Sequence, residues 1–165
     1  MEKRPHALLL TFPGTNCEHE TARALKEAGF STAIVTLTEL DDTTLNAAQL
    51  VVFSGGFSYG DYIMSGRLAT LELTAKIGDQ MKTFRDNGGY LLGICNGFQI
   101  LTKLGLMPEG SLIHNTSGKF ICKWVTLENK QPDNAFLHGL PAEFEFPVAH
   151  AEGRSAGPVH LGAHL

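Results

Sequence analysis

The chain has 165 residues, of which 43% are hydrophobic and 18% charged, a composition typical of one globular domain with a buried apolar core. The formal net charge of -4 does not favour a nucleic-acid or anionic-membrane partner, because such partners select a basic surface. No apolar run approaches the ~20 residues that span a bilayer and no signal peptide is recognised, so we expect a cytoplasmic protein without a membrane partner.

The first two thirds of the chain alternate short apolar runs with helical patterns. Nearly continuous apolar runs predict strands at residues 7–12, 32–37, 50–53 and 90–94. Apolar residues at helical spacing, each set followed by glycine, predict helices at 17–28, 65–87 and 97–104. A short helix is expected between the second and third strands. This order predicts an α/β fold with an open, mostly parallel sheet and helices on both faces.

The alternation ends after residue 110. Strands are predicted at 120–127 and 143–149 with no long helix between them, which favours a small antiparallel extension of the sheet. Residues 155–165 carry no helix or strand pattern. Since no repeat, linker or low-complexity tract interrupts the chain, residues 1–165 are interpreted as one domain.

The strongest chemical signal is the segment Gly-Ile-Cys-Asn-Gly around Cys95, where a predicted strand runs into a predicted helix. This is the nucleophile-elbow arrangement with cysteine as the nucleophile, and the tight turn requires small residues two before and two after it. The start of a helix favours a thiolate and places the N–H of Asn96 where an oxyanion forms. The alternative is a buried cysteine in an ordinary turn.

Two other loops follow predicted strands at the same edge of the sheet. The loop GGFSYGD begins with Gly55, Gly56 and Phe57, and its backbone N–H groups offer a second oxyanion donor beside Cys95. It lacks the Gly-Lys-Ser/Thr ending of a phosphate loop, and no GxGxxG follows the first strand. The segment FPGTNC, residues 12–17, either lines the site or a partner interface, or simply caps the next helix through Thr15 or Asn16.

A cysteine nucleophile needs a base, and His150 with Glu152 two residues later offers one, which makes a Cys-His-Glu triad conceivable. The alternative is a polar strand end with a satisfied histidine. The spacing of His138, His150, His160 and His164 is irregular, and the three cysteines contain no CxxC pair, so we expect no metal site and no disulfide framework.

The segments FPGTNC, GGFSYGD, GICNGFQIL and PVAHAEGR, in this order, resemble the glutaminase subunits of phosphoribosylformylglycinamidine synthase, which belong to the class I (triad) glutamine amidotransferases. The resemblance runs from about Leu8 to Arg154. It implies a flavodoxin-like amidotransferase fold in which Cys95 attacks glutamine, forms a thioester and releases ammonia. It also implies that Gly55 or Gly56 and Asn96 hold the oxyanion, and that Gln99 and residues 57–61 line the glutamine pocket.

The resemblance further implies a synthetase (large) subunit as partner, and often a third small subunit. On the synthetase subunit, ATP and magnesium would drive the conversion of formylglycinamide ribonucleotide to formylglycinamidine ribonucleotide in purine biosynthesis. No cofactor is therefore expected in this chain. The family carries its triad histidine and glutamate as His-Pro-Glu, which this sequence lacks. We therefore expect the C-terminal part of the family domain to be missing. Two alternatives stay open: a non-catalytic truncated subunit that binds the synthetase, and another cysteine hydrolase of the same architecture.

Overall fold

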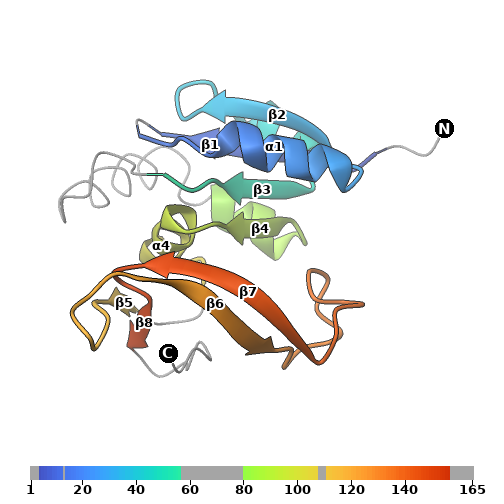
Figure 1. The fold of residues 1–165 in the computed structure, drawn as a ribbon. Coiled ribbons are helices and arrows are strands. Elements are labelled where there is room, and N and C mark those ends of the chain that lie inside the picture. Colours follow the sequence, from blue (N-terminus) through green and yellow to red (C-terminus); the bar gives the residue numbers. More distant parts are fainter. Residues whose placement is uncertain (1–3, 13, 57–79, 108–110, 157–165) are drawn as a thin grey trace. The chain divides into compact units, whose positions relative to one another are not determined.

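The computed structural model describes residues 4–12, 14–56, 80–107 and 111–156 (Figure 1). They fall into two compact units, Met1–Pro108 and Glu109–Leu165, and each unit is described by itself. That both units form one amidotransferase domain stays a prediction. Within the described ranges, no helix combines the length and the hydropathy that crossing a lipid bilayer requires.

The first unit is built on a four-stranded sheet whose strands are all parallel. Its strands are β1 (His6–Thr11), β2 (Ser31–Thr36), β3 (Leu50–Phe53) and β4 (Tyr90–Gly93). They lie in the order β2-β1-β3-β4, with β1 pairing to both β2 and β3 and β3 pairing to β4. The predicted parallel α/β sheet is confirmed. The bounds of its strands differ from the predicted bounds by one residue at most.

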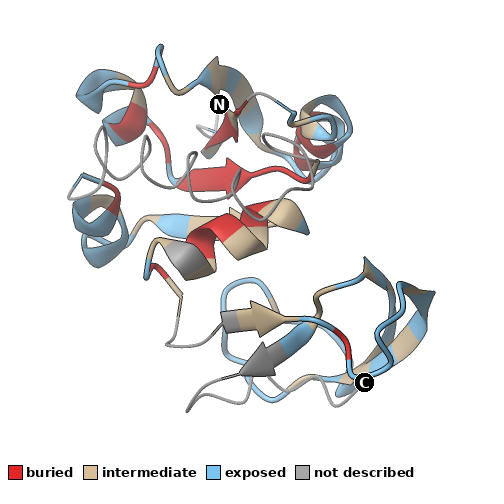
Figure 2. Cartoon of the chain, turned by 90° about the vertical axis from the view of Figure 1, so that its left-hand side faces the viewer, coloured by how far each residue is buried: buried red, intermediate tan, exposed pale blue. Residues whose placement is uncertain are grey.

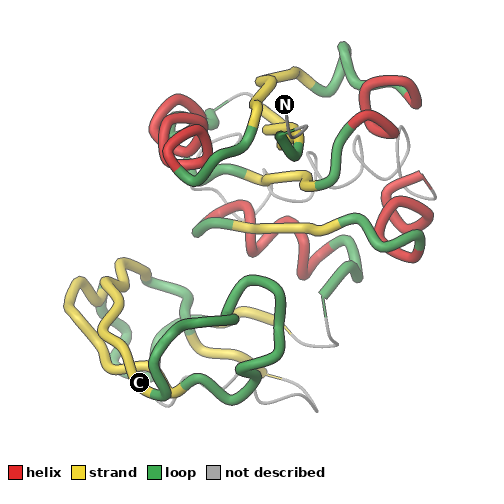
Figure 3. The backbone as a smooth tube through the Cα atoms, turned by 90° about the vertical axis from the view of Figure 1, so that its right-hand side faces the viewer, coloured by secondary structure: helices red, strands yellow, loops and turns green. Residues whose placement is uncertain are grey.

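Helices cover both faces of this sheet, as Figure 3 shows for the first unit. They are α1 (Glu18–Glu27), α2 (Asp42–Ala47), the helical residues 80–86 and α4 (Asn96–Lys103). Successive side chains of β1 point to opposite faces of the sheet. Leu8 and Leu10 pack in a core with residues of α2, of 80–86 and of α4, whereas Ala7 and Leu9 pack in a second core with α1.

The two central strands carry the deepest burial. All four side chains of β3 are buried, and Leu8 and Leu9 of β1 are fully inaccessible to solvent, which Figure 2 shows as red strands in the middle of the unit. Truncation of such a leucine to alanine typically lowers the free energy of unfolding by about 2–5 kcal/mol. The core therefore holds the ends of β3 and β4 at a fixed spacing, and the candidate site begins at those ends.

The short helix α2 has a side-chain cap. The carboxylate of Asp41 accepts hydrogen bonds from the Thr44 backbone N–H at 2.7 Å and from the Thr44 hydroxyl at 2.6 Å. These bonds favour the charged carboxylate and so lower the pKa of Asp41. The short helix expected between the second and third strands thus forms, and an N-cap residue sets its start.

The second unit is antiparallel, as predicted. The long strands β6 (Ile121–Glu128) and β7 (Glu143–His150) pair with each other, and the three-residue strands β5 (Ser111–Ile113) and β8 (Arg154–Ala156) form a separate pair. The prediction that residues 155–165 carry no strand is wrong at its start, because Ser155 and Ala156 belong to β8. A three-residue strand has no periodicity of its own, and pairing with β5 defines it.

Candidate functional site

Cys95 lies in the turn between β4 and α4 in an unusual backbone conformation. Its φ of 52° and ψ of -113° make it the one non-glycine residue with positive φ among the described residues. Such a conformation costs of order 1–3 kcal/mol and persists only where the surroundings impose it. The side chain is exposed and the thiol is free. The alternative of a buried structural cysteine is therefore wrong, because the strained turn presents the sulfur to solvent.

The glycines on either side of Cys95 are required by space. A Cβ atom on Gly93 would lie 2.6 Å from the Cα of Phe98, and one on Gly97 would overlap the carbonyl oxygen of Phe53. Both contacts involve backbone, which does not move aside easily. The predicted need for small residues two before and two after Cys95 is confirmed. It comes from close packing of α4 against the end of β4 at Gly93 and against the end of β3 at Gly97.

The end of β3 lies directly beside this elbow. Ile94 donates its backbone N–H to the carbonyl of Phe53 at 3.0 Å, which continues the β3–β4 pairing up to the nucleophile. A Cβ on Gly55 would lie 3.5 Å from the Cβ of Cys95, so Gly55 is a neighbour of Cys95 with room for no more than one added carbon between them. Gly55 and Gly56 thus lie where the sequence predicted an oxyanion loop. Phe57 and residues 58–61 lie outside the described residues.

The turn after β1 lies against the same loop. Thr15 forms an isolated antiparallel bridge with Gly56, and the backbone N–H groups of Asn16 and Cys17 both donate to the carbonyl of Gly55 at 3.4 Å. The prediction that Thr15 or Asn16 caps the following helix is wrong. The N-cap residue of α1 is Cys17, which makes no side-chain cap bond. Thr15 instead accepts a hydrogen bond from the N–H of Phe12 at 3.0 Å, which closes the turn.

Asn96 and Gln99 lie on the first turn of α4. The Asn96 side chain donates from Nδ2 to Oε1 of Gln99 at 3.1 Å, so the two predicted site residues are in contact. Oδ1 of Asn96 is buried and accepts no hydrogen bond from the described residues. As the first residue of α4, Asn96 also has a backbone N–H without an intrahelical acceptor. Neither group has a hydrogen-bond partner among the described residues.

His150 and Glu152 belong to the second unit, where each has a different partner. Nδ1 of His150 lies 3.0 Å from Oδ1 of Asn115, and Nε2 of His114 lies 3.4 Å from Oε1 of Glu152. A Cβ on Gly153 would overlap the His150 ring, so the chain turns tightly over that ring. Their role as catalytic base and its partner stays a prediction.

Asn115 is the residue in this region that sequence reasoning missed. It is buried, with 7% exposure, and its Nδ2 donates to the carbonyls of Lys119 and His150 at 2.9 and 3.0 Å. Its Oδ1 also accepts from the Gly153 N–H at 3.1 Å. The segment His-Asn-Thr-Ser-Gly signals a turn in the sequence, but nothing local indicates contact with a residue 35 positions away.

The described residues hold no group of three or more His, Cys, Asp or Glu side chains placed to bind a metal ion. Of the four histidines considered from the sequence, His160 and His164 lie outside the described residues. The expectation of a chain without a metal of its own stays a prediction.

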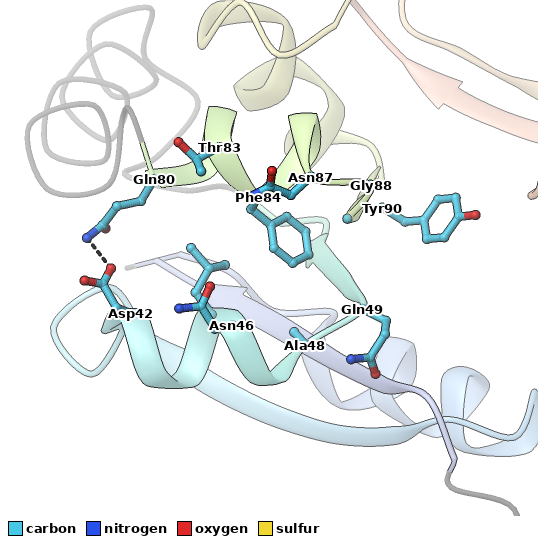
Figure 4. Close-up of a pocket in the computed structure, with 12 residues that line it drawn as sticks. Asp42, Asn46, Ala48, Gln49, Gln80, Thr83, Phe84, Asn87, Gly88 and Tyr90 are labelled. Carbon is cyan, nitrogen blue, oxygen red and sulfur yellow. Dashed lines mark hydrogen bonds between the residues drawn. The ribbon is translucent and has the colours of Figure 1, made fainter.

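A cavity of about 520 Å³ lies between α2 and the helical residues 80–86 (Figure 4). It is lined by residues of these helices, by Gln49 and Gly89, which precede β3 and β4, and by Tyr90, the first residue of β4. Gln80 donates to Asp42 across one end. Its lining includes neither Cys95 nor Gly55, which follow the opposite, carboxyl ends of the strands. This cavity is therefore not the predicted nucleophile site.

Residues 4–159 match the family described as the CobB/CobQ-like glutamine amidotransferase domain. Three similar proteins share the name phosphoribosylformylglycinamidine synthase subunit PurQ. That of Thermotoga maritima is 39% identical over 153 residues, 92% of this chain. Those of Dehalococcoides mccartyi and Cereibacter sphaeroides are 39% and 43% identical over 91% and 94% of this chain. The chain spans between 62% and 68% of the length of these three relatives.

Solved structures agree with this match. A chain in the structure of PurLQS from Thermotoga maritima superposes with a TM-score of 0.80 at 37% identity, covering 93% of this chain and 70% of that one. A glutamine amidotransferase from Thermotoga maritima superposes with a TM-score of 0.62 at 20% identity, covering 95% of this chain and 64% of that one. The second likeness is one of fold alone.

Proposed function

The chain belongs to the family of CobB/CobQ-like glutamine amidotransferase domains, and from this premise we propose that it is the glutaminase subunit of a phosphoribosylformylglycinamidine synthase. It hydrolyses glutamine to glutamate and ammonia. The ammonia passes to a synthetase subunit, which uses ATP to convert formylglycinamide ribonucleotide to formylglycinamidine ribonucleotide. The names of the relatives support the identity of this reaction.

The observation that carries the proposal is the conformation of Cys95. The thiol is exposed and adds nothing to the buried core, yet the packing at Gly93 and Gly97 holds Cys95 in a strained conformation. A Cβ built on Gly55 would lie 3.5 Å from the Cβ of Cys95, and the first turn of α4 begins immediately after Cys95. A thiol, a glycine loop with backbone N–H groups and a helix start at one sheet edge together suit acyl transfer through an oxyanion.

In this reaction the sulfur of Cys95 adds to the amide carbon of glutamine. The carbonyl oxygen becomes an oxyanion, which the N–H of Asn96 and an N–H of the Gly55–Gly56 loop stabilise. Collapse of the intermediate breaks the C–N bond, and the leaving nitrogen takes a proton and departs as ammonia. Water then adds to the thioester, which releases glutamate and restores the thiol. Gln99 orients the substrate from the first turn of α4.

The proton transfers require a base. His150 and Glu152 have the residue types of a base and its partner, but they do not match the family's His-Pro-Glu pattern, which this sequence lacks. In the second unit the His150 ring is already oriented by Asn115, which leaves Nε2 for a proton. Asn115 rather than Glu152 would then be the residue that fixes the tautomer.

The partner is a synthetase subunit, in agreement with the word "subunit" in the relatives' name and with the PurLQS assembly of Thermotoga maritima. We also propose a small third subunit in the complex. ATP and magnesium act on the synthetase, and the present chain binds glutamine without a cofactor of its own. The relatives named PurQ disfavour both a peptidase-like cysteine enzyme and a non-catalytic subunit.

The test is Cys95→Ala in the complex with the synthetase. Glutamine-dependent synthesis should be abolished, because the thioester cannot form, while ammonia-dependent synthesis should be unchanged, because added ammonia bypasses this subunit. Both activities are measured as product formation with either nitrogen source. Loss of both together would contradict the role of Cys95.

His150→Ala serves as the matched variant in the same assay. If the base lies elsewhere, the glutamine-dependent rate should fall far less than in Cys95→Ala. An equal loss would instead identify His150 as the base.

A further inference from the structure

The turn between β1 and α1, residues 14–17, is the one sequence motif to which the proposed reaction gives no role. It contributes no nucleophile, no base and no side-chain bond that caps a helix, yet it contacts the loop beside Cys95. The inference below rests on the proposed function and assigns this turn a part in it.

Three contacts tie the turn to Gly55 and Gly56. The carbonyl oxygen of Gly55 accepts hydrogen bonds from the backbone N–H groups of Asn16 and Cys17, each at 3.4 Å. Gly56 adopts a φ of +147°, and a Cβ atom there would lie 2.6 Å from the carbonyl oxygen of Gly14 and 2.8 Å from the Cα of Thr15. The turn therefore fixes both the direction of the Gly55 carbonyl and the space around Gly56.

The direction of that carbonyl determines the direction of the next N–H. The peptide bond between Gly55 and Gly56 is trans, so its C=O and its N–H point to opposite sides of the chain. Because the carbonyl points to the turn, the N–H of Gly56 points away from it. In the described part of the chain this N–H donates to no acceptor. A Cβ built on Gly55 would lie 3.5 Å from the Cβ of Cys95, so this peptide is a neighbour of Cys95.

We propose that the turn of residues 14–17 is a positioning element of the glutaminase site. It holds the Gly55–Gly56 peptide so that the N–H of Gly56, with the N–H of Asn96, binds the oxyanion. This choice distinguishes Gly56 from Gly55 as the second donor, which the sequence left open. Thr15 is the positioning residue, because its hydroxyl accepts the Phe12 N–H and its own N–H donates to the Phe12 carbonyl at 2.9 Å.

The experiment replaces Thr15 in the protein assayed with its synthetase. Thr15→Val keeps the shape of the side chain but removes the acceptor for Phe12. We expect kcat for glutamine hydrolysis to fall roughly tenfold, less than the ~100- to 1000-fold of a deleted oxyanion donor, with the glutamine KM nearly unchanged. Thr15→Ser, which restores the hydroxyl, should recover most of kcat. Thr15→Ala is the second variant if the valine protein does not fold.

Alkylation of Cys95 by iodoacetamide separates positioning from general damage. This displacement forms no oxyanion, so Thr15→Val should react at the parental rate while its kcat is reduced. Equal loss of alkylation and hydrolysis would overturn the inference, because the turn would then support the whole elbow. A parental kcat in Thr15→Val would also overturn it. Absence of hydrolysis in the parent itself would instead count against the proposed function.

Thr44→Val is the matched control. It removes the same hydroxyl at the start of α2, where Thr44 donates to Asp41 at 2.6 Å, so kcat and KM should stay at parental values. A loss as large as that of Thr15→Val would show that removal of a threonine hydroxyl elsewhere in this unit lowers kcat as much, and it would contradict the positioning role of the turn.

Discussion

The elbow around Cys95 and the segment around His150 are each held in one conformation, but by different interactions. At the elbow, Gly93 and Gly97 leave room for backbone packing within a stretch of five residues. In the second unit, His150 and Gly153 are held by one buried side chain, Asn115, from a turn 35 residues earlier. Close backbone packing that only glycine permits defines the first region, and a hydrogen-bonding side chain defines the second.

The difference explains why the two regions differ in what a sequence reveals. A steric requirement for glycine leaves a visible pattern, because no other residue fits. A polar network leaves no pattern, since many residues can occupy the positions between its members. The two regions should accordingly respond to different kinds of substitution.

The largest expected effect comes from Gly97→Ala. The new Cβ would overlap the carbonyl oxygen of Phe53, which is fully buried and cannot yield, so we expect a loss of about 3 kcal/mol or more in the free energy of unfolding. Urea unfolding of the parent and the variant measures it. Gly105→Ala is the control: its φ is +66° but nothing lies within 4 Å of a Cβ there, so only backbone strain of ~1–2 kcal/mol remains. Similar losses in both variants would show that space is not the constraint.

The next effect concerns Asn115→Ala. Removal of its side chain leaves the carbonyls of Lys119 and His150 and the N–H of Gly153 without this partner, and we expect a local destabilisation of about 1–3 kcal/mol. Amide hydrogen exchange at residues 150–153 should accelerate accordingly. The exposed Asn134, whose Oδ1 accepts from the N–H of Phe136, provides the control as Asn134→Ala, with no change expected at residues 150–153. Unchanged exchange in Asn115→Ala would remove the contrast between the two regions.

The smallest effect is expected from Cys95→Gly compared with Cys95→Ala. Both remove the thiol, but only alanine keeps the Cβ that makes the φ of 52° costly. Relief of ~1–3 kcal/mol of strain, less ~0.5–1 kcal/mol of glycine entropy, should leave the glycine variant more stable than the alanine variant by about 1 kcal/mol. Thermal unfolding of both gives the difference. A less stable glycine variant would mean that the turn is not strained.

Much of the first unit follows from sequence patterns. The apolar runs of β1 and β3 are short, buried on both faces and bounded by turn residues. Their continuous apolar character and the turn residues that bound them identify them as strands. Asn96 was predicted from its place directly after Cys95, whereas Gln99 came from the family resemblance, and the roles of both stay predictions. The strands β5 and β8 have three residues each, and pairing alone makes them strands. The role of Thr15 was also mispredicted, since its partner is Phe12 rather than the next helix.

The sequence by itself determined the parallel α/β fold, the elbow around Cys95 and the family. Local sterics and hydrophobic periodicity act over a few residues, so they depend on residue types that can be recognised in the sequence. The tertiary structure decided which backbone groups face which: the Gly55 carbonyl toward the β1–α1 turn, the Phe53 carbonyl against Gly97, and Asn115 against His150. Such choices depend on contacts between segments 35 to 44 residues apart, where any polar backbone group can serve as a partner. They are set by the packing of the folded chain.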